Sequence, residues 1–223
     1  MTTNPWMRRL AATAVAALLI PACKSAGVPD TLFLDTFVNA YPGTNWVEAA
    51  PTGTAIAVKD VTHGVGTTPP FESLAMTASS VSSSITTQTA SSFNPAAVTF
   101  SVEMAADTAS GADGIGTITI RNTITGPVAS VTWNRTTSDL KLTIFGTSDQ
   151  HYLTPTADLT FHRFTFSATA GGPATWTMDN GSPLISVATN FPAGPWAVEL
   201  GSSFPTGTSW ATFYFDNVTV TSP

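Results

Sequence analysis

The stretch Val98-Thr99-Phe100-Ser101-Val102-Glu103-Met104 decides the fold class, because apolar and polar side chains alternate along it without a break. Period-two alternation places one face of a β-strand against a core and the other toward water. The same pattern returns in the runs 117–121, 129–133, 140–144, 174–178 and 196–200. No segment after residue 30 shows a helical period with caps, so we expect an all-β chain.

Turn signals separate these runs at 113–114, 146–149, 171–173 and 179–181. The last of them, Asp179-Asn180-Gly181, predicts a tight hairpin between Trp176 and Leu184-Ile185, because Asn-Gly supplies the positive φ angles of primed turns. About twelve to fourteen short strands with such spacing favour a two-sheet antiparallel jelly-roll sandwich. No long linker divides the chain, so residues 31–223 are expected to form one domain.

Composition excludes several classes of protein. The chain has 223 residues, of which 43% are hydrophobic and only 10% charged, and its formal net charge is −6. A chain this acidic is not a basic nucleic-acid binder, and one this apolar is not a disordered polar chain. Solubility therefore rests on Ser and Thr hydroxyls more than on charge.

The N-terminus carries an export signal. Arg8 and Arg9 precede the uncharged run Leu10–Ile20, which has the order of a secretory signal peptide. That run is too short to cross a bilayer, which takes about 20 residues. The segment Leu19-Ile20-Pro21-Ala22-Cys23 resembles the lipobox of bacterial lipoproteins.

The lipobox resemblance implies cleavage before Cys23 and acylation of its thiol. We therefore expect a signal peptide over residues 1–22, a lipidated tether over 23–30, and a membrane as partner through the lipid. Lys24 after the cysteine resembles the residue that sorts lipoproteins to the outer membrane, so the expected address is the outer membrane or cell surface. An ordinary secretory signal with a stray cysteine is the alternative.

Short segments at both ends and in the middle resemble concanavalin A-like lectin/glucanase and laminin-G-like domains. They are Phe161–Phe166 followed by Ala174–Gly181, the opening Leu34-Asp35-Thr36-Phe37, and the closing strand Phe215–Val220. The resemblance covers roughly residues 31–223. It implies that the first and last strands pair, but a fold of this kind hosts unrelated functions.

The sequence favours a non-catalytic protein. Glucanases of this superfamily use an E-x-D-x-E strand, and the nearest match, Glu103-Met104-Ala105-Ala106-Asp107, lacks the middle carboxylate. The three histidines lack zinc-ligand spacing, and no G-x-S-x-G elbow occurs. Gln150-His151-Tyr152 resembles the His and Tyr of jelly-roll polysaccharide lyases, but the basic strand of those enzymes is absent.

Two acidic residues, Asp35 and Asp216, occur among apolar residues. We expect Asp35 on one strand face with Phe33 and Phe37, and Asp216 on a face with Trp210, Tyr214, Val218 and Val220. A buried carboxylate must be compensated by hydrogen bonds or a cation. Hydrogen bonding to the backbone or to water is the favoured interpretation. The family resemblance also implies a structural Ca²⁺ near the paired chain ends, and exposure at a strand end is the third alternative.

A polar sheet face is the candidate glycan-binding surface. It is expected to unite Thr99, Ser101 and Glu103 with the polar residues of the runs 117–121, 130–134 and 141–145. The candidate ligand-binding residues on it are Glu103, Arg121, Asn134 and Lys141. A merely solvated face is the favoured alternative, since any antiparallel sheet exposes one. Trp133, Trp176 and Trp196 are expected in the core, whereas Trp46 and Trp210 are undecided.

Together these patterns predict a lipid-anchored, non-catalytic envelope protein that binds oligo- or polysaccharide or serves in adhesion. A structural envelope protein without a small ligand is the first alternative. A glycoside hydrolase or polysaccharide lyase of the jelly-roll superfamily is the second. The sequence leaves the ligand and the oligomeric state open.

Overall fold

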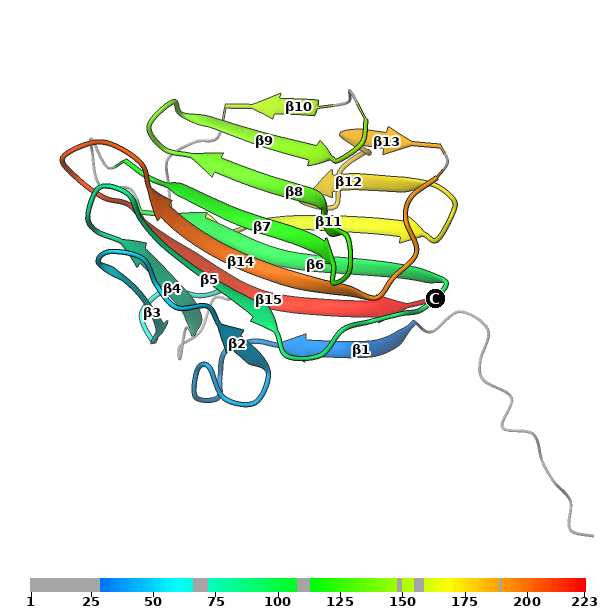
Figure 1. The fold of residues 1–223 in the computed structure, drawn as a ribbon, viewed down its shortest axis with the longest axis horizontal. Helices are drawn as coiled ribbons and strands as arrows, with labels where there is room; N and C mark the ends of the chain where they lie inside the picture. The colour runs from blue at the N-terminus through cyan, green and yellow to red at the C-terminus, as the bar shows by residue number, and fades with distance from the viewer. Residues whose placement is uncertain (1–28, 66–71, 108–112, 148–149, 155–158, 189) are drawn as a thin grey trace, which may run out of the picture.

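The chain forms a sandwich of two antiparallel β-sheets in a computed structural model (Figure 1). The structure describes residues 29–65, 72–107, 113–147, 150–154, 159–188 and 190–223. The predicted signal peptide, Cys23 and most of the tether lie outside these residues. Across the described ranges there is no helix long and apolar enough to cross a membrane.

Sheet A has the strand order β13-β12-β11-β6-β15-β4-β3, and β1 also pairs with β15. Its strands are β1 (Asp30–Asp35), β3 (Ala55–Asp60), β4 (Ser73–Ala78), β6 (Ala97–Ala106), β11 (His162–Thr169), β12 (Ala174–Met178), β13 (Ile185–Val187) and β15 (Thr212–Ser222).

Sheet B has the strand order β10-β9-β8-β7-β14-β5-β2. Its strands are β2 (Trp46–Glu48), β5 (Ser83–Thr89), β7 (Ile115–Asn122), β8 (Gly126–Asn134), β9 (Asp139–Ile144), β10 (Gln150–Leu153) and β14 (Trp196–Phe204). The predicted two-sheet antiparallel jelly-roll sandwich is thus confirmed.

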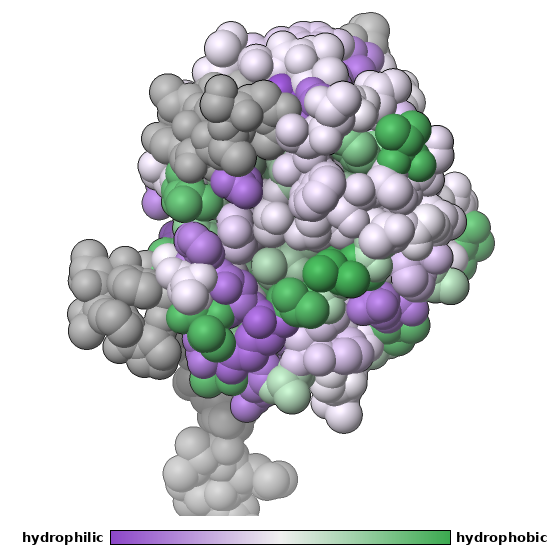
Figure 2. Space-filling view, turned by 90° about the vertical axis from the view of Figure 1, so that its left-hand side faces the viewer, coloured by the Kyte–Doolittle hydropathy of each residue, from purple (hydrophilic) through white to green (hydrophobic). Residues whose placement is uncertain are grey.

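The core lies between the sheets and is built from the apolar positions of the alternating runs. Trp133, Trp176 and Trp196 are each at most 1% exposed, which confirms their predicted core placement. Trp46 is also buried, whereas Trp210 is 49% exposed. Seen from the left-hand side of Figure 1, the surface is mostly of near-neutral hydropathy, as a hydroxyl-rich exterior should be (Figure 2).

The predicted pairing of the chain ends is confirmed, since β1 pairs with β15 from Asp30↔Ser222 to Asp35↔Val218. The predicted turn after β12 also forms, but in a different frame. Asp179 and Asn180 have φ angles of 51° and 58°, and the Gly181 amide donates to the Met178 carbonyl at 2.9 Å. The two positive φ angles of the primed turn therefore fall on Asp179-Asn180 rather than on Asn180-Gly181.

A β-bulge corrects the predicted surroundings of Asp216. The register between β15 and β6 shifts between Asp216 and Thr219, and Asn217 adopts a φ of 47°. Alternation restarts after the bulge, so Val218 and Val220 face the core, whereas Asp216 lies opposite Glu103. The predicted common face of Asp216 with these two valines is therefore wrong.

Asp35 and Phe37 do not share a strand face either. β1 ends at Asp35, and Phe37 lies beyond it with a φ of 54°. Phe37 is 2% exposed and stacks on Trp46 with ring centroids 5.7 Å apart. The turn at the end of β1 thus brings Phe37 into the core without strand alternation.

Candidate functional site

The predicted single polar face is divided between the two sheets. Arg121, Asn134 and Lys141 belong to β7, β8 and β9 of sheet B, whereas Glu103 belongs to β6 of sheet A. The prediction of one common surface is wrong because the chain passes from sheet A to sheet B between β6 and β7. Strands that follow one another in the sequence need not lie in the same sheet, and the alternation of apolar and polar residues does not indicate which sheet a strand joins.

The outward face of sheet B carries two rows of residues, polar except for Gly201, in register across six strands. One row is Gln88, Glu199, Thr119, Ser130, Thr143 and Gln150. The next is Thr86, Gly201, Thr117, Thr132, Lys141 and Tyr152. The buried residues that alternate with them face the core, so these rows face outward. They form a broad surface of hydroxyl and amide groups.

Charged side chains and one aromatic side chain also belong to this surface. Arg121 Nη1 lies 3.3 Å from Glu199 Oε2, with both side chains partly exposed. Lys141 Nζ lies 5.6 Å from the ring centroid of Tyr152, which is 57% exposed. Sequence reasoning missed Tyr152 as a surface aromatic, although the outward placement of Gln150 and Tyr152 follows from alternation with His151 and Leu153.

The middle of the face stays shallow because of Gly201. A Cβ at this position would meet Thr117 Oγ1 at 2.6 Å and Thr86 Cγ2 at 3.2 Å. A larger residue at this position would therefore collide with the two threonine side chains that flank β14. Small side chains at the centre leave the surface open to an extended ligand.

Asn134 has a local structural role at the rim. Its Oδ1 accepts the backbone N–H of Thr136 at 2.9 Å and that of Thr137 at 3.2 Å. The side chain thus closes the turn between β8 and β9, as Asn commonly does.

The described face of sheet B has no carboxylate pair suited to glycoside hydrolysis. Glu199 and Asp139 are the acids on the outward rows of β5, β7, β8, β9 and β14. They lie three strand positions apart, which is roughly 14 Å across the sheet alone. Hydrolytic pairs stand about 5 to 9.5 Å apart.

Two carboxylates do meet on sheet A, where Asp216 lies opposite Glu103. Glu103 is 5% exposed; its Oε1 accepts Arg163 Nε at 2.8 Å and its Oε2 accepts Asn217 Nδ2 at 2.6 Å. Burial raises the pKa of Asp216 to about 6, and the charge of Glu103 adds to this shift. Asp107, the last residue of the E-x-D-x-E near match, lies beyond the end of β6.

The oxygens of this pair are already used within the protein. Asp216 Oδ2 accepts the Val65 amide at 2.9 Å, and Oδ1 accepts the Asn217 amide at 2.6 Å. Each of the four carboxylate oxygens of Glu103 and Asp216 thus accepts a donor. The arrangement holds the bulge and the loop at Val65 in place.

Asp35 is compensated by hydrogen bonds, as the favoured interpretation expected, but two of the three donors are side chains rather than backbone. Its Oδ1 accepts the Phe37 amide at 2.7 Å, and its Oδ2 accepts Asn45 Nδ2 and Trp46 Nε1, both at 2.9 Å. These contacts tie the end of β1 to sheet B through Trp46. Asp35 is therefore a poor calcium ligand, because N–H groups already surround its oxygens.

Asp216 has the same limit as a calcium ligand, because each of its oxygens also accepts a backbone N–H. Ser73, one residue along β4 from the Leu74↔Phe215 pair, has a buried Oγ without a partner among the described residues, as does Glu72 Oε2. Calcium binds through oxygen, so Asp216, Glu72 and Ser73 supply suitable donor chemistry. The described residues hold no cluster of three His, Cys, Asp or Glu side chains for a metal. The calcium site stays a prediction.

No protein-family model matches the sequence, and no curated protein is significantly similar to it. Solved structures do match its fold. The cellulose-induced protein Cip1 is 15% identical with a TM-score of 0.61, over 84% of this chain and 96% of its own. A Bacillus licheniformis β-glucanase is 13% identical with a TM-score of 0.57, over 89% and 99%.

A legume lectin-like domain from Entamoeba histolytica is 7% identical with a TM-score of 0.52, over 79% of this chain and 89% of its own. At these identities the likeness shows the fold alone. The chain has the concanavalin A-like jelly roll that glucanases and lectin-like domains share, so its activity must be argued from its own face residues.

Proposed function

We propose, on the premise of this jelly-roll fold, that the chain is a non-catalytic glycan-binding protein that holds polysaccharide on the outward face of sheet B. One observation carries the proposal: two in-register rows cross six strands, one of them ends at the exposed Tyr152, and the described residues of the face include no carboxylate pair for hydrolysis.

The face supplies the two kinds of contact that sugars need. Threonine, serine and glutamine side chains both donate and accept hydrogen bonds, which suits sugar hydroxyls. The exposed ring of Tyr152 offers an apolar surface on which a sugar ring can stack. Lys141 over this ring and the Arg121–Glu199 pair on the central strands β7 and β14 add charged groups to the face.

The proposal includes an envelope location. Acylation of Cys23 would tether the sandwich to a membrane through the segment 23–30, and two or more acyl chains would anchor it stably. Incorporation of labelled palmitate that is lost in Cys23→Ser tests this step. Labelling that persists in the variant would refute the lipid anchor without touching the glycan proposal.

Binding to immobilised β-glucan, xylan, mannan and mucin tests the glycan proposal. We expect the wild-type protein to bind at least one of them and to release no reducing sugar. The double variant Lys141→Ala/Tyr152→Ala should lose at least tenfold in affinity. Trp210→Ala is the matched control, because Trp210 is also a half-exposed aromatic but lies outside the polar rows.

Absence of wild-type binding to every polysaccharide would refute the proposal in favour of a purely structural envelope protein. Release of reducing sugar that is lost on Glu103→Ala would refute the non-catalytic part. Equal losses in the Trp210 control and in the double variant would refute the assignment to sheet B.

A further inference from the structure

We infer that the outward face of sheet A is a second polysaccharide-binding surface, so that one molecule bridges two glycan chains. This inference rests on the proposed function of sheet B. It assigns a second site on the opposite side of the sandwich, with a linear, hydroxyl-rich polysaccharide as its ligand class.

Two rows of hydroxyl residues cross four strands of sheet A in register. The first row is Thr221, Thr99, Ser167 and Thr175, from β15, β6, β11 and β12. The second is Thr219, Ser101, Thr165 and Thr177 from the same strands. The rows stand two residues apart along every strand, so all eight side chains point to the same outward face.

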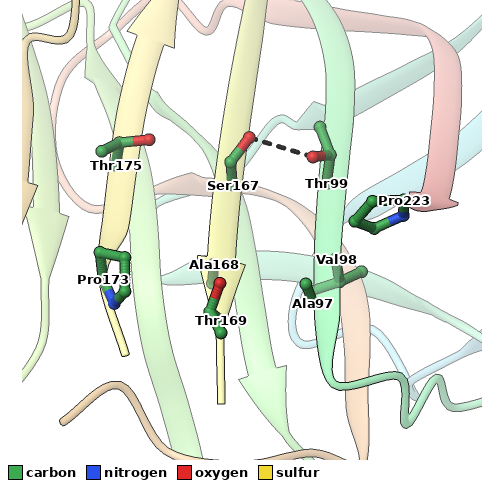
Figure 3. A pocket seen from close by; sticks show the side chains of 9 residues that line it. All are labelled: Ala97, Val98, Thr99, Ser167, Ala168, Thr169, Pro173, Thr175 and Pro223. Atoms are coloured by element: carbon green, nitrogen blue, oxygen red, sulfur yellow. Dashed lines mark hydrogen bonds between the residues drawn. The ribbon is translucent and has the colours of Figure 1, made fainter. Parts of the chain in front are cut away.

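The surface over these rows is hollowed. A hollow of about 220 Å³ lies over β6, β11 and β12, between Pro173 and Pro223, with Thr99 and Ser167 on its floor (Figure 3). A second hollow of about 340 Å³ lies over β15, β6 and β11 and reaches Arg163. Thr99 lines both hollows, so they adjoin across four strands.

The hydroxyl groups are held in place before any ligand arrives. Thr99 Oγ1 lies 3.0 Å from Ser167 Oγ, as Figure 3 shows, and Ser101 Oγ lies 3.4 Å from Thr165 Oγ1. Each hydroxyl retains hydrogen-bonding capacity beyond that one bond. Side chains that are already ordered lose little entropy on binding, which favours affinity.

Arg163 closes one end of the adjoining hollows with a positioned donor. Its Nε bonds Glu103 Oε1 at 2.8 Å, while 43% of the side chain stays exposed and lines the second hollow. Because the buried Glu103 fixes one edge of the guanidinium, N–H groups on the exposed part remain for a ligand oxygen. The salt bridge thereby orients a cationic donor over the hydroxyl rows.

The spacing of the rows suits a linear polysaccharide that lies across the strands. Neighbouring hydroxyls in a row are one strand spacing apart, about 4.8 Å. This is close to the advance of an extended polysaccharide per sugar, so successive sugars meet successive hydroxyls. The two sheets pack about 10 Å apart and expose opposite faces, so chains bound to both do not collide.

Light scattering by soluble β-glucan, or by the panel polysaccharide that binds best, tests bridging with the full chain carrying Cys23→Ala. The protein with both faces intact should cross-link the polymer and raise the scattering. Calorimetry with a short oligosaccharide should find two sites per molecule. Thr99→Val/Ser167→Ala should abolish the scattering and leave one site. Lys141→Ala/Tyr152→Ala should abolish it too.

Thr77→Val/Thr212→Val is the matched control. This pair also bonds hydroxyl to hydroxyl, at 2.8 Å between β4 and β15, but it lines neither hollow. It should scatter as the wild type does. One site per wild-type molecule, or full scattering from Thr99→Val/Ser167→Ala, would overturn the inference, whereas absence of any binding would overturn the proposed function itself.

Discussion

The buried carboxylate of Asp216 makes stability depend on pH. Its side chain is 4% exposed, and burial, reinforced by the charge of Glu103, raises its pKa from 3.8 to about 6. Because the folded protein binds this proton more tightly than the unfolded chain does, the free energy of unfolding falls as pH rises from about 4 to about 6. A shift of about two units corresponds to about 3 kcal/mol.

Urea unfolding of the wild type and of Asp216→Asn, at pH values from about 4 to about 7, measures this effect. The asparagine does not titrate, and its single carbonyl oxygen does not replace both oxygens that accept N–H groups in Asp216. The lost hydrogen bond therefore destabilises the variant by an amount that does not change with pH. The free energy of unfolding of the variant, relative to wild type, should then rise by about 3 kcal/mol over this range.

Asp60→Asn is the control of opposite sign. Burial alone would raise the pKa of Asp60, but hydrogen bonds from Thr62 and His63 lower it overall. Because the pKa of Asp60 lies below 3.8, wild type should lose stability relative to Asp60→Asn only as pH falls below that value, so this pair is followed to lower pH than the Asp216 pair. Parallel pH curves for wild type and Asp216→Asn would refute the reasoning.

Three further predictions concern the core and the calcium site. Asp35→Ala should lower the free energy of unfolding by about 3 kcal/mol or more in urea, since it removes three hydrogen bonds to a carboxylate; a loss below about 1 kcal/mol would contradict this. Trp176→Phe should lower the free energy of unfolding by about 1 kcal/mol more than Trp196→Phe does. The reason is that Trp176 Nε1 donates to a β9 carbonyl at 3.1 Å, whereas Trp196 Nε1 has no partner among the described residues. Equal unfolding midpoints of the two variants would contradict this. If calcium binds at Asp216, the calorimetric melting temperature of the wild type should be higher in calcium than in chelator, and that of Asp216→Asn should not differ. An unchanged wild-type melting temperature would exclude the metal.

Sequence alternation was enough to predict the sandwich and its core. The runs around Phe100, Trp133 and Trp196 each supply one buried face, and these three rings are among the fully buried side chains. The pairing of the first and last strands followed from the family resemblance. The core depends on local alternation, which a single sequence displays, whereas the pairing of distant strands required the resemblance.

The candidate site was predicted only in part. Arg121 and Lys141 share a face as expected, but Glu103 lies on the other sheet, because the crossing between β6 and β7 leaves alternation unchanged. The bulge at Asn217 depends on contacts with β6, and the ion pair of Arg163 with Glu103 joins residues 60 positions apart. Such pairings follow from strand order, which no local pattern encodes.

Chemical-shift mapping with soluble β-glucan, or with the panel polysaccharide that binds best, tests the central claim most directly. The account predicts perturbed side-chain signals along the outward rows of sheet B, at Thr117, Thr119, Thr132, Lys141 and Tyr152, with no cleavage of the polysaccharide. Perturbations that spare these rows, or shortening of the polysaccharide during the titration, would contradict it.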